Sequence, residues 1–119
     1  MHSEIIDRLF SAVHNNDVQA YLTCFTEDAE YRAGNFPAVK GHQGIVEFAK
    51  PMLEMFSSVT HTVKNIWQSG DIVCCELDLT YVRRKDGKVV TVPCCDVIRL
   101  EGGKVKSLRA FLDPSPAFS

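Results

Sequence analysis

The sequence predicts an α+β fold in which three N-terminal helices pack on a strongly curved, mostly antiparallel sheet. The main observation is a change of hydrophobic period near Ser57, from helical spacing to alternation along several long segments. A second observation is that short links containing glycine join these segments, and links of this length favour antiparallel hairpins. A sheet curved around helices leaves a cone-shaped pocket, where small-molecule sites commonly form.

The first half of the chain carries the helical pattern. The three expected helices span residues 3–15, Val18 to Phe25 and Ile45 to Phe56. Pro51 falls inside the third helix and should kink it or split it near Lys50, because proline cannot donate the helical hydrogen bond. A short strand is expected over Ala29 to Ala33.

The second half is rich in β-branched residues that alternate with polar ones. The four expected strands span Val59 to Gln68, Ile72 to Arg83, Lys88 to Leu100 and Lys104 to Leu112. Gly102-Gly103 is a strong hairpin signal between the last two. No repeat or linker interrupts the 119 residues, so we expect a single domain over residues 1–119.

Composition excludes several classes of function. The formal net charge of −2 provides no electrostatic footprint for nucleic acid, and no apolar run of about 18 residues predicts a membrane span. The N-terminus lacks the layout of a signal peptide, so a cytoplasmic protein is expected. The five cysteines include two adjacent pairs in predicted strands, whose side chains point to opposite faces. We therefore expect neither a metal site nor a disulfide framework, and no cofactor.

Asp96 is the most unusual residue, because it lies in mid-strand among apolar and thiol-bearing neighbours. Alternation places Arg99 on the opposite face, and since arginine is the harder residue to bury, Asp96 should point inward. A buried carboxyl has a raised pKa and suits proton transfer, whereas on a wet face it would mean little. The same alternation predicts further polar or aromatic side chains in the pocket: His61, Asn65, Trp67 and Tyr81.

Four motifs resemble the nuclear transport factor two-like superfamily, in which SnoaL-like proteins and ketosteroid isomerases are nearest. They are Asp28-Ala29, Gly41-His42-Gln43-Gly44-Ile45, Pro93 to Arg99 and Leu112 to Pro116. The resemblance extends from Ile5 to Phe118 and implies the cone-shaped fold. It also points to Asn35 and Asp113 as site residues, although a turn that ends the last strand is the favoured interpretation of Asp113, and Asn35 could stabilise its own loop.

The resemblance to ketosteroid isomerase must be carried over residue by residue. That enzyme uses a protonated aspartic acid in the strand where this chain has Asp96. Its tyrosine and its aspartate base fall at about Leu9 and Ala33, neither of which can transfer a proton. Steroid isomerase activity is therefore not expected.

Three functions remain open from sequence. The first is a cofactor-independent isomerase, cyclase or dehydratase that acts on a small apolar molecule. Asp96 and His61 would be catalytic there, and Tyr81, Trp67, Asn35, Asn65 and Asp113 would bind substrate. The second is a non-catalytic ligand-binding protein, and the third is a dimeric interaction module. A homodimer through the open sheet face is expected in each case, since the predicted outward residues are unusually apolar: Thr91, Cys95, Val97, Val105 and Phe111.

Overall fold

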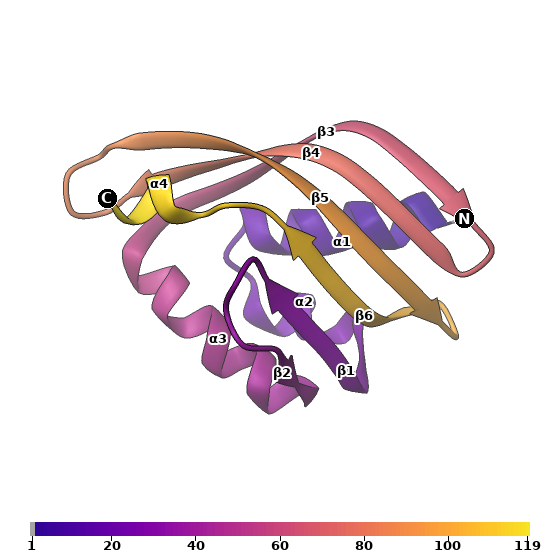
Figure 1. The fold of residues 1–119 in the computed structure, drawn as a ribbon. Coiled ribbons are helices and arrows are strands. Elements are labelled where there is room, and N and C mark those ends of the chain that lie inside the picture. The colour runs from indigo at the N-terminus through magenta and orange to yellow at the C-terminus, as the bar shows by residue number, and fades with distance from the viewer. Residues whose placement is uncertain (1) are drawn as a thin grey trace.

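The computed structural model describes residues 2–119, with side chains from residue 4 onward. It is an α+β domain in which α1, α2 and α3 lie against one face of a curved six-stranded sheet (Figure 1). The sheet order is β2-β1-β6-β5-β4-β3. The elements are α1 (His2–His14), α2 (Val18–Thr23), β1 (Phe25–Ala33), β2 (Val39–Lys40), α3 (Gly41–Met55), β3 (Phe56–Ser69), β4 (Ile72–Arg83), β5 (Val89–Glu101), β6 (Lys104–Phe111) and α4 (Ser115–Phe118).

The predicted fold class is confirmed. The sheet is mostly antiparallel, and only the pairing of β1 with β6 is parallel. Of the two effects predicted for Pro51, a kink or a split, the split is wrong, because α3 continues through it to Met55. Pro51 is exposed, as is Glu47, whose carbonyl loses its helical partner. Water can bind that carbonyl, so the helix tolerates the proline.

Two irregularities in strand pairing decide which side chains face the helices. The register of β3 against β4 shifts between Val63 and Asn65. Because a shift of one residue reverses alternation, Asn65 then pairs with the outward Glu76 and Trp67 with Cys74. The prediction that Asn65 and Trp67 face inward is therefore wrong.

The second irregularity lies between β5 and β6, where the register shifts between Arg99 and Leu100. It pairs Val105 with the buried Leu100, and Val105 is 0% exposed. The prediction of an outward Val105 is therefore wrong for the same physical reason. Phe111 remains on the outer face and is 50% exposed.

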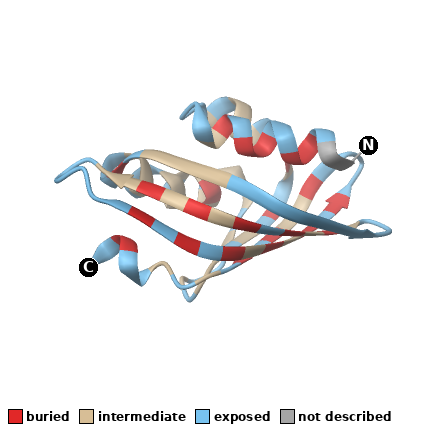
Figure 2. Ribbon diagram, turned by 90° about the horizontal axis from the view of Figure 1, so that it is seen from above, coloured by how far each residue is buried: buried red, intermediate tan, exposed pale blue. Residues whose placement is uncertain are grey.

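The core lies between the inner face of the sheet and the helices. Figure 2 shows buried positions alternating with exposed ones along the long strands, as expected for a sheet with one covered face. Leu9 of α1 is 1% exposed within this core. No helix in residues 2–119 is long and apolar enough to cross a membrane.

Candidate functional site

A cavity of about 160 Å³ lies inside the cone, between α2, α3 and the sheet. For comparison, an apolar cavity of about 150 Å³ can hold one benzene molecule. Most of the wall is aliphatic or aromatic. Its polar and aromatic members are Asn16, Asp17, Tyr21, Tyr31, Phe36, Phe48, Phe56, His61, Tyr81 and Phe118. The cavity therefore has the composition typical of a small-ligand site.

Asp96 lies behind the cavity wall and not on it. Its side chain is 4% exposed, which confirms the predicted inward orientation. The strand partners of Asp96 are Cys75 on β4 and Ala110 on β6, and Ala110 lines the cavity. The Cys94 thiol donates a hydrogen bond to Oδ1 of Asp96 at 3.3 Å. Burial raises the pKa of the Asp96 carboxyl to about 6, against a smaller opposing effect of the Cys94 bond.

Sequence reasoning missed two tyrosines of the cavity wall on which the Asp96 charge acts. Tyr21 on α2 and Tyr31 on β1 both line the wall, and each phenol lies close enough to the other to influence its pKa. Burial raises the pKa of both phenols, and the nearby Asp96 charge raises them further. Tyr21 resembled an ordinary member of an apolar helix stripe. Tyr31 shares a strand face with Ala29 and Ala33. Assigning every residue of β1 to a face would therefore have placed Tyr31 inside.

Tyr81 lies on the cavity wall, in agreement with its predicted inward orientation. It is 8% exposed, and its ring packs on Phe56 with centroids 4.8 Å apart. Burial raises the pKa of its phenol to about 12, with smaller contributions from Cys94 and Asp96. All three cavity tyrosines therefore stay protonated and can donate hydrogen bonds at neutral pH.

His61 also lines the cavity, but the structure does not bring it to Asp96. His61 on β3 pairs with Leu79 of β4. Asp96 on β5 pairs with Cys75 of β4, four residues away from Leu79 and across the other edge of that strand. The His61 ring stacks on Phe10 at a centroid distance of 4.1 Å, and its backbone N–H donates to Nε2 of His14 at 2.8 Å. Burial lowers the pKa of the imidazole to about 3. His61 is therefore neutral over the physiological range.

The remaining predicted site residues lie outside the cavity wall. Trp67 is 56% exposed on the outer face, where the Asn65 amide donates to Oε1 of Glu76 at 2.7 Å. Asn35 is exposed in the loop after β1. Asp113 is exposed too, and its Oδ1 accepts a hydrogen bond from the Ser115 backbone N–H at 3.1 Å. This contact is the turn at the end of the last strand that the Asp-Pro sequence favours.

The rim of the cavity is formed by the C-terminal segment. Phe118 of α4 lines the cavity and packs edge-on against Phe36 and Phe56. Gly34 has φ of +53°, and a Cβ there would meet the Leu112 carbonyl at 3.0 Å, so glycine permits the close approach of the loop and this segment.

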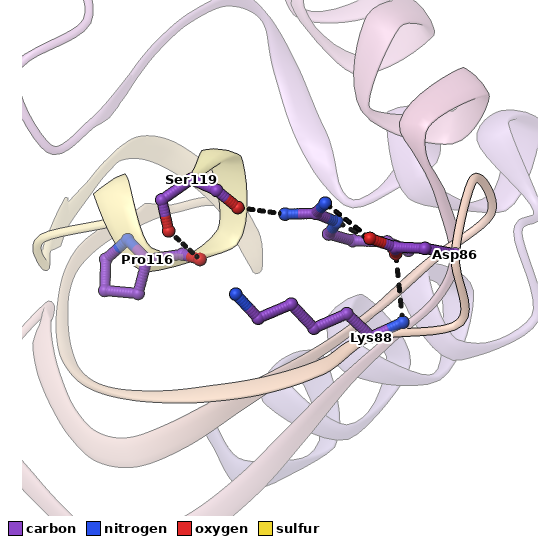
Figure 3. Close-up of polar contacts among 5 residues, drawn as sticks. Asp86, Lys88, Pro116 and Ser119 are labelled. Atoms are coloured by element: carbon purple, nitrogen blue, oxygen red, sulfur yellow. Dashed lines mark hydrogen bonds and ion pairs between the residues drawn. The ribbon is translucent and has the colours of Figure 1, made fainter.

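One arginine fixes the end of the same segment. The Arg83 guanidinium donates hydrogen bonds both to Asp86 and to the Ser119 carbonyl, two residues that are labelled in Figure 3. The Asp86 carboxylate accepts two bonds from it, at 3.1 and 2.6 Å. The rim is therefore held by both aromatic packing and a charged hydrogen bond.

Metal ligation has no geometric support in the part of the chain that the structure describes. No three histidine, cysteine or acidic side chains gather there in a way that could hold an ion. The cysteines in that part are free thiols.

The curved sheet, with helices on one face and a cavity between them, is the fold of nuclear transport factor two-like proteins. More particularly, the chain belongs to the SnoaL-like domain family, whose model matches residues 6–108. A search of curated protein sequences found no match.

Solved structures share the fold at low sequence identity. A protein from Jannaschia sp. CCS1, described as a candidate SnoaL-like polyketide cyclase, is 22% identical over 98% of this chain and 88% of that chain, with a TM-score of 0.85. A protein of ketosteroid isomerase-like fold from Catenulispora acidiphila, in complex with trimethylamine, is 20% identical over 91% and 84%, with a TM-score of 0.83. TerC, co-crystallised with polyporic acid, is 18% identical over 98% and 94%, with a TM-score of 0.85.

Proposed function

We propose that this protein is a cofactor-independent enzyme that performs acid–base chemistry on a small apolar molecule inside the cone, of the isomerase, cyclase or dehydratase type. The observation that carries the proposal is Asp96: burial raises the pKa of its carboxyl to about 6, and its charge acts on tyrosines that line the cavity. A carboxyl with this pKa can give and take a proton near neutral pH.

The proposed division of roles follows from burial and reach. Tyr21 and Tyr31 donate hydrogen bonds to an oxygen of the substrate, because their raised pKa values keep them protonated. Asp96 supplies or accepts the proton at the base of this tyrosine pair. Tyr81 orients the substrate from β4. Related proteins described as polyketide cyclases support the reaction class only as an analogy of fold.

Proton exchange gives a direct test. Small cyclic ketones are incubated with the protein in D₂O, and NMR follows deuterium incorporation beside the carbonyl. We expect the wild type to accelerate exchange, and Asp96→Asn to reduce the acceleration by about 10²–10⁴-fold while ketone binding is retained. Asp113→Asn is the matched control, since Asp113 is exposed and outside the cavity. No exchange with the wild type, or full exchange with Asp96→Asn, would reject the proposal.

A second candidate function is ligand binding without turnover. It is favoured by Ala33, which lines the cavity at the position where ketosteroid isomerase has its base. In that case ligands bind equally well to the wild type and to Asp96→Asn, and neither protein exchanges deuterium.

We also propose that the protein forms a homodimer through the outer sheet face. Trp67 and Phe111 are exposed there, beside the half-buried Cys95 and Val97. The Arg109 guanidinium lies 5.0 Å from the centre of the Phe111 ring and covers it only in part. Phe111→Glu should convert a dimer to a monomer in analytical ultracentrifugation, and a wild type that sediments as a monomer at micromolar concentration would refute the dimer.

A further inference from the structure

The feature that carries a further inference is the neutral His61 on the cavity wall. Its Nδ1 is the one side-chain nitrogen or oxygen in the described part of the chain that is buried without a hydrogen-bond partner. The His61 ring lines the cavity, but its Nδ1 atom is buried away from it. Other atoms of the ring must therefore form this part of the wall. Nε2 is therefore the nitrogen left to interact with a ligand.

The location of the imidazole proton follows from the same geometry. A neutral imidazole carries one N–H donor and one lone pair. A buried N–H without an acceptor is a rare and costly arrangement, whereas an unpaired acceptor is tolerated more often. The proton therefore belongs on Nε2, and His61 offers the ligand a donor. The aromatic stack on Phe10 and the neighbouring His14 ring, whose centroid lies 5.6 Å away, fix the ring in place.

The tyrosines provide a second set of hydrogen-bond donors, on the side of the cone opposite His61. Tyr31 is on β1 and His61 is on β3, at opposite ends of the row of long strands β1-β6-β5-β4-β3. Both line one cavity, so the curved sheet brings them to facing walls. Tyr21 and Tyr31 provide phenol donors at one wall, and His61 provides an N–H donor at the other. Between them the wall is mainly apolar.

The charges on the cavity wall further restrict the class of ligand that can bind. No lysine or arginine lines the cavity within residues 2–119. Asp17 is its one charged member there, and Oδ1 of Asp17 already accepts a hydrogen bond from Ala20 in the cap of α2. An anionic ligand would enter without a counter-ion, which costs free energy in an apolar site.

We propose that the cavity selects an uncharged, single-ring compound with hydrogen-bond acceptors at both ends, and that His61 determines this specificity by donating through Nε2 to the acceptor opposite the tyrosines. The choice of a single ring follows from the cavity volume of about 160 Å³, since a cavity of about 150 Å³ can hold one benzene molecule. The proposal rests on the cavity being the ligand site of the proposed function. It does not require turnover.

A matched series of neutral probes tests the proposal by NMR titration of the full chain. The series is 4-methoxyacetophenone with two acceptor groups, acetophenone with one, and ethylbenzene with none. We expect affinity to rise with the number of acceptor groups, from ethylbenzene to acetophenone to 4-methoxyacetophenone. His61→Phe, which keeps a flat ring against Phe10, should weaken 4-methoxyacetophenone by about tenfold, the worth of one hydrogen bond, and leave ethylbenzene unchanged.

The outcomes separate specificity from general damage. Equal weakening of all three probes by His61→Phe, or no weakening of the two-acceptor probe, overturns the role of His61. Tighter binding of 4-methoxybenzoate or of a benzyltrimethylammonium ion than of the neutral ketone overturns the proposed ligand class. Nitrogen-15 NMR of the wild type should find the His61 proton on Nε2, and a proton on Nδ1 contradicts the donor assignment. These experiments measure binding and not turnover. A negative result in the deuterium exchange assay would therefore reject the proposed enzyme activity without affecting the test of ligand specificity.

Discussion

Replacing Asp96 with asparagine should change how the stability of the protein depends on pH. Asparagine keeps the shape of the side chain and cannot ionise. Burial raises the Asp96 pKa from its ordinary value of 3.8 to about 6 in the folded protein. Below pH 3.8 the carboxyl is protonated in both states, so its ionisation costs nothing. Between 3.8 and 6 the unfolded chain releases the proton first, and the folded state loses stability as pH rises.

The size of the effect follows from the pKa difference. The pKa difference between 3.8 and about 6 corresponds to about 3 kcal/mol, and about 2.5 kcal/mol of this falls between pH 4 and pH 8. Asp96 is 4% exposed, so solvent screening reduces the figure little. We therefore expect the free energy of unfolding of the wild type to fall by about 2.5 kcal/mol relative to Asp96→Asn over that range. Ionisable groups common to both proteins cancel in the comparison.

The assay is urea denaturation of both proteins at half-unit steps of pH. Asp113→Asn is an informative control, because the hydrogen bond from Ser115 lowers the pKa of Asp113. Its contribution is present above the unfolded pKa and is lost as pH falls, so its trend has the opposite sign. A stability difference between wild type and Asp96→Asn that does not vary with pH would refute the buried, pKa-raised carboxyl.

Three further predictions address the outer face, the thiols and the core. Iodoacetamide at pH 8 should first alkylate the partly exposed Cys74 and Cys95, whereas Cys75, with burial raising its pKa to about 12, should react only after unfolding; early labelling of Cys75 in mass spectra would contradict this. Trp67 fluorescence should be quenched by acrylamide equally with and without a cavity ligand, since the indole is on the outer face. Phe56→Ala should lower the free energy of unfolding by about 3–5 kcal/mol, and a urea-measured loss below about 1 kcal/mol would contradict its place in the core.

Sequence reasoning succeeded where one local pattern decides the outcome. The long strands β4 and β5 alternate without interruption, so the orientation of Asp96 and Tyr81 could be predicted from Arg99 and Leu79. It failed for Trp67, because the bulge after Val63 reverses the faces of β3. No glycine or proline marks that bulge, and strand periodicity carries no other signal for an extra residue.

The tyrosine pair was missed for a different reason. Tyr21 and Tyr31 come from a helix and a strand that are close in sequence, but their meeting with Asp96 depends on the parallel pairing of β1 with β6. Pairing between elements distant in the chain leaves no local pattern. The resemblance to ketosteroid isomerase directed attention to Leu9 and Ala33, which are apolar, and away from the tyrosines whose pKa values the Asp96 charge raises.

The energetics of the cone favour a function for its polar groups. Burial of the Asp96 charge costs about 3 kcal/mol near neutral pH, and the unpaired Nδ1 of His61 costs about 1–3 kcal/mol. A domain of this size has a total stability of about 5–15 kcal/mol. Leucine and phenylalanine at these positions would avoid both costs and pack against the same neighbours. A core that served only to stabilise the fold would not need either group, whereas a cavity that orients a polar ligand and moves a proton needs both.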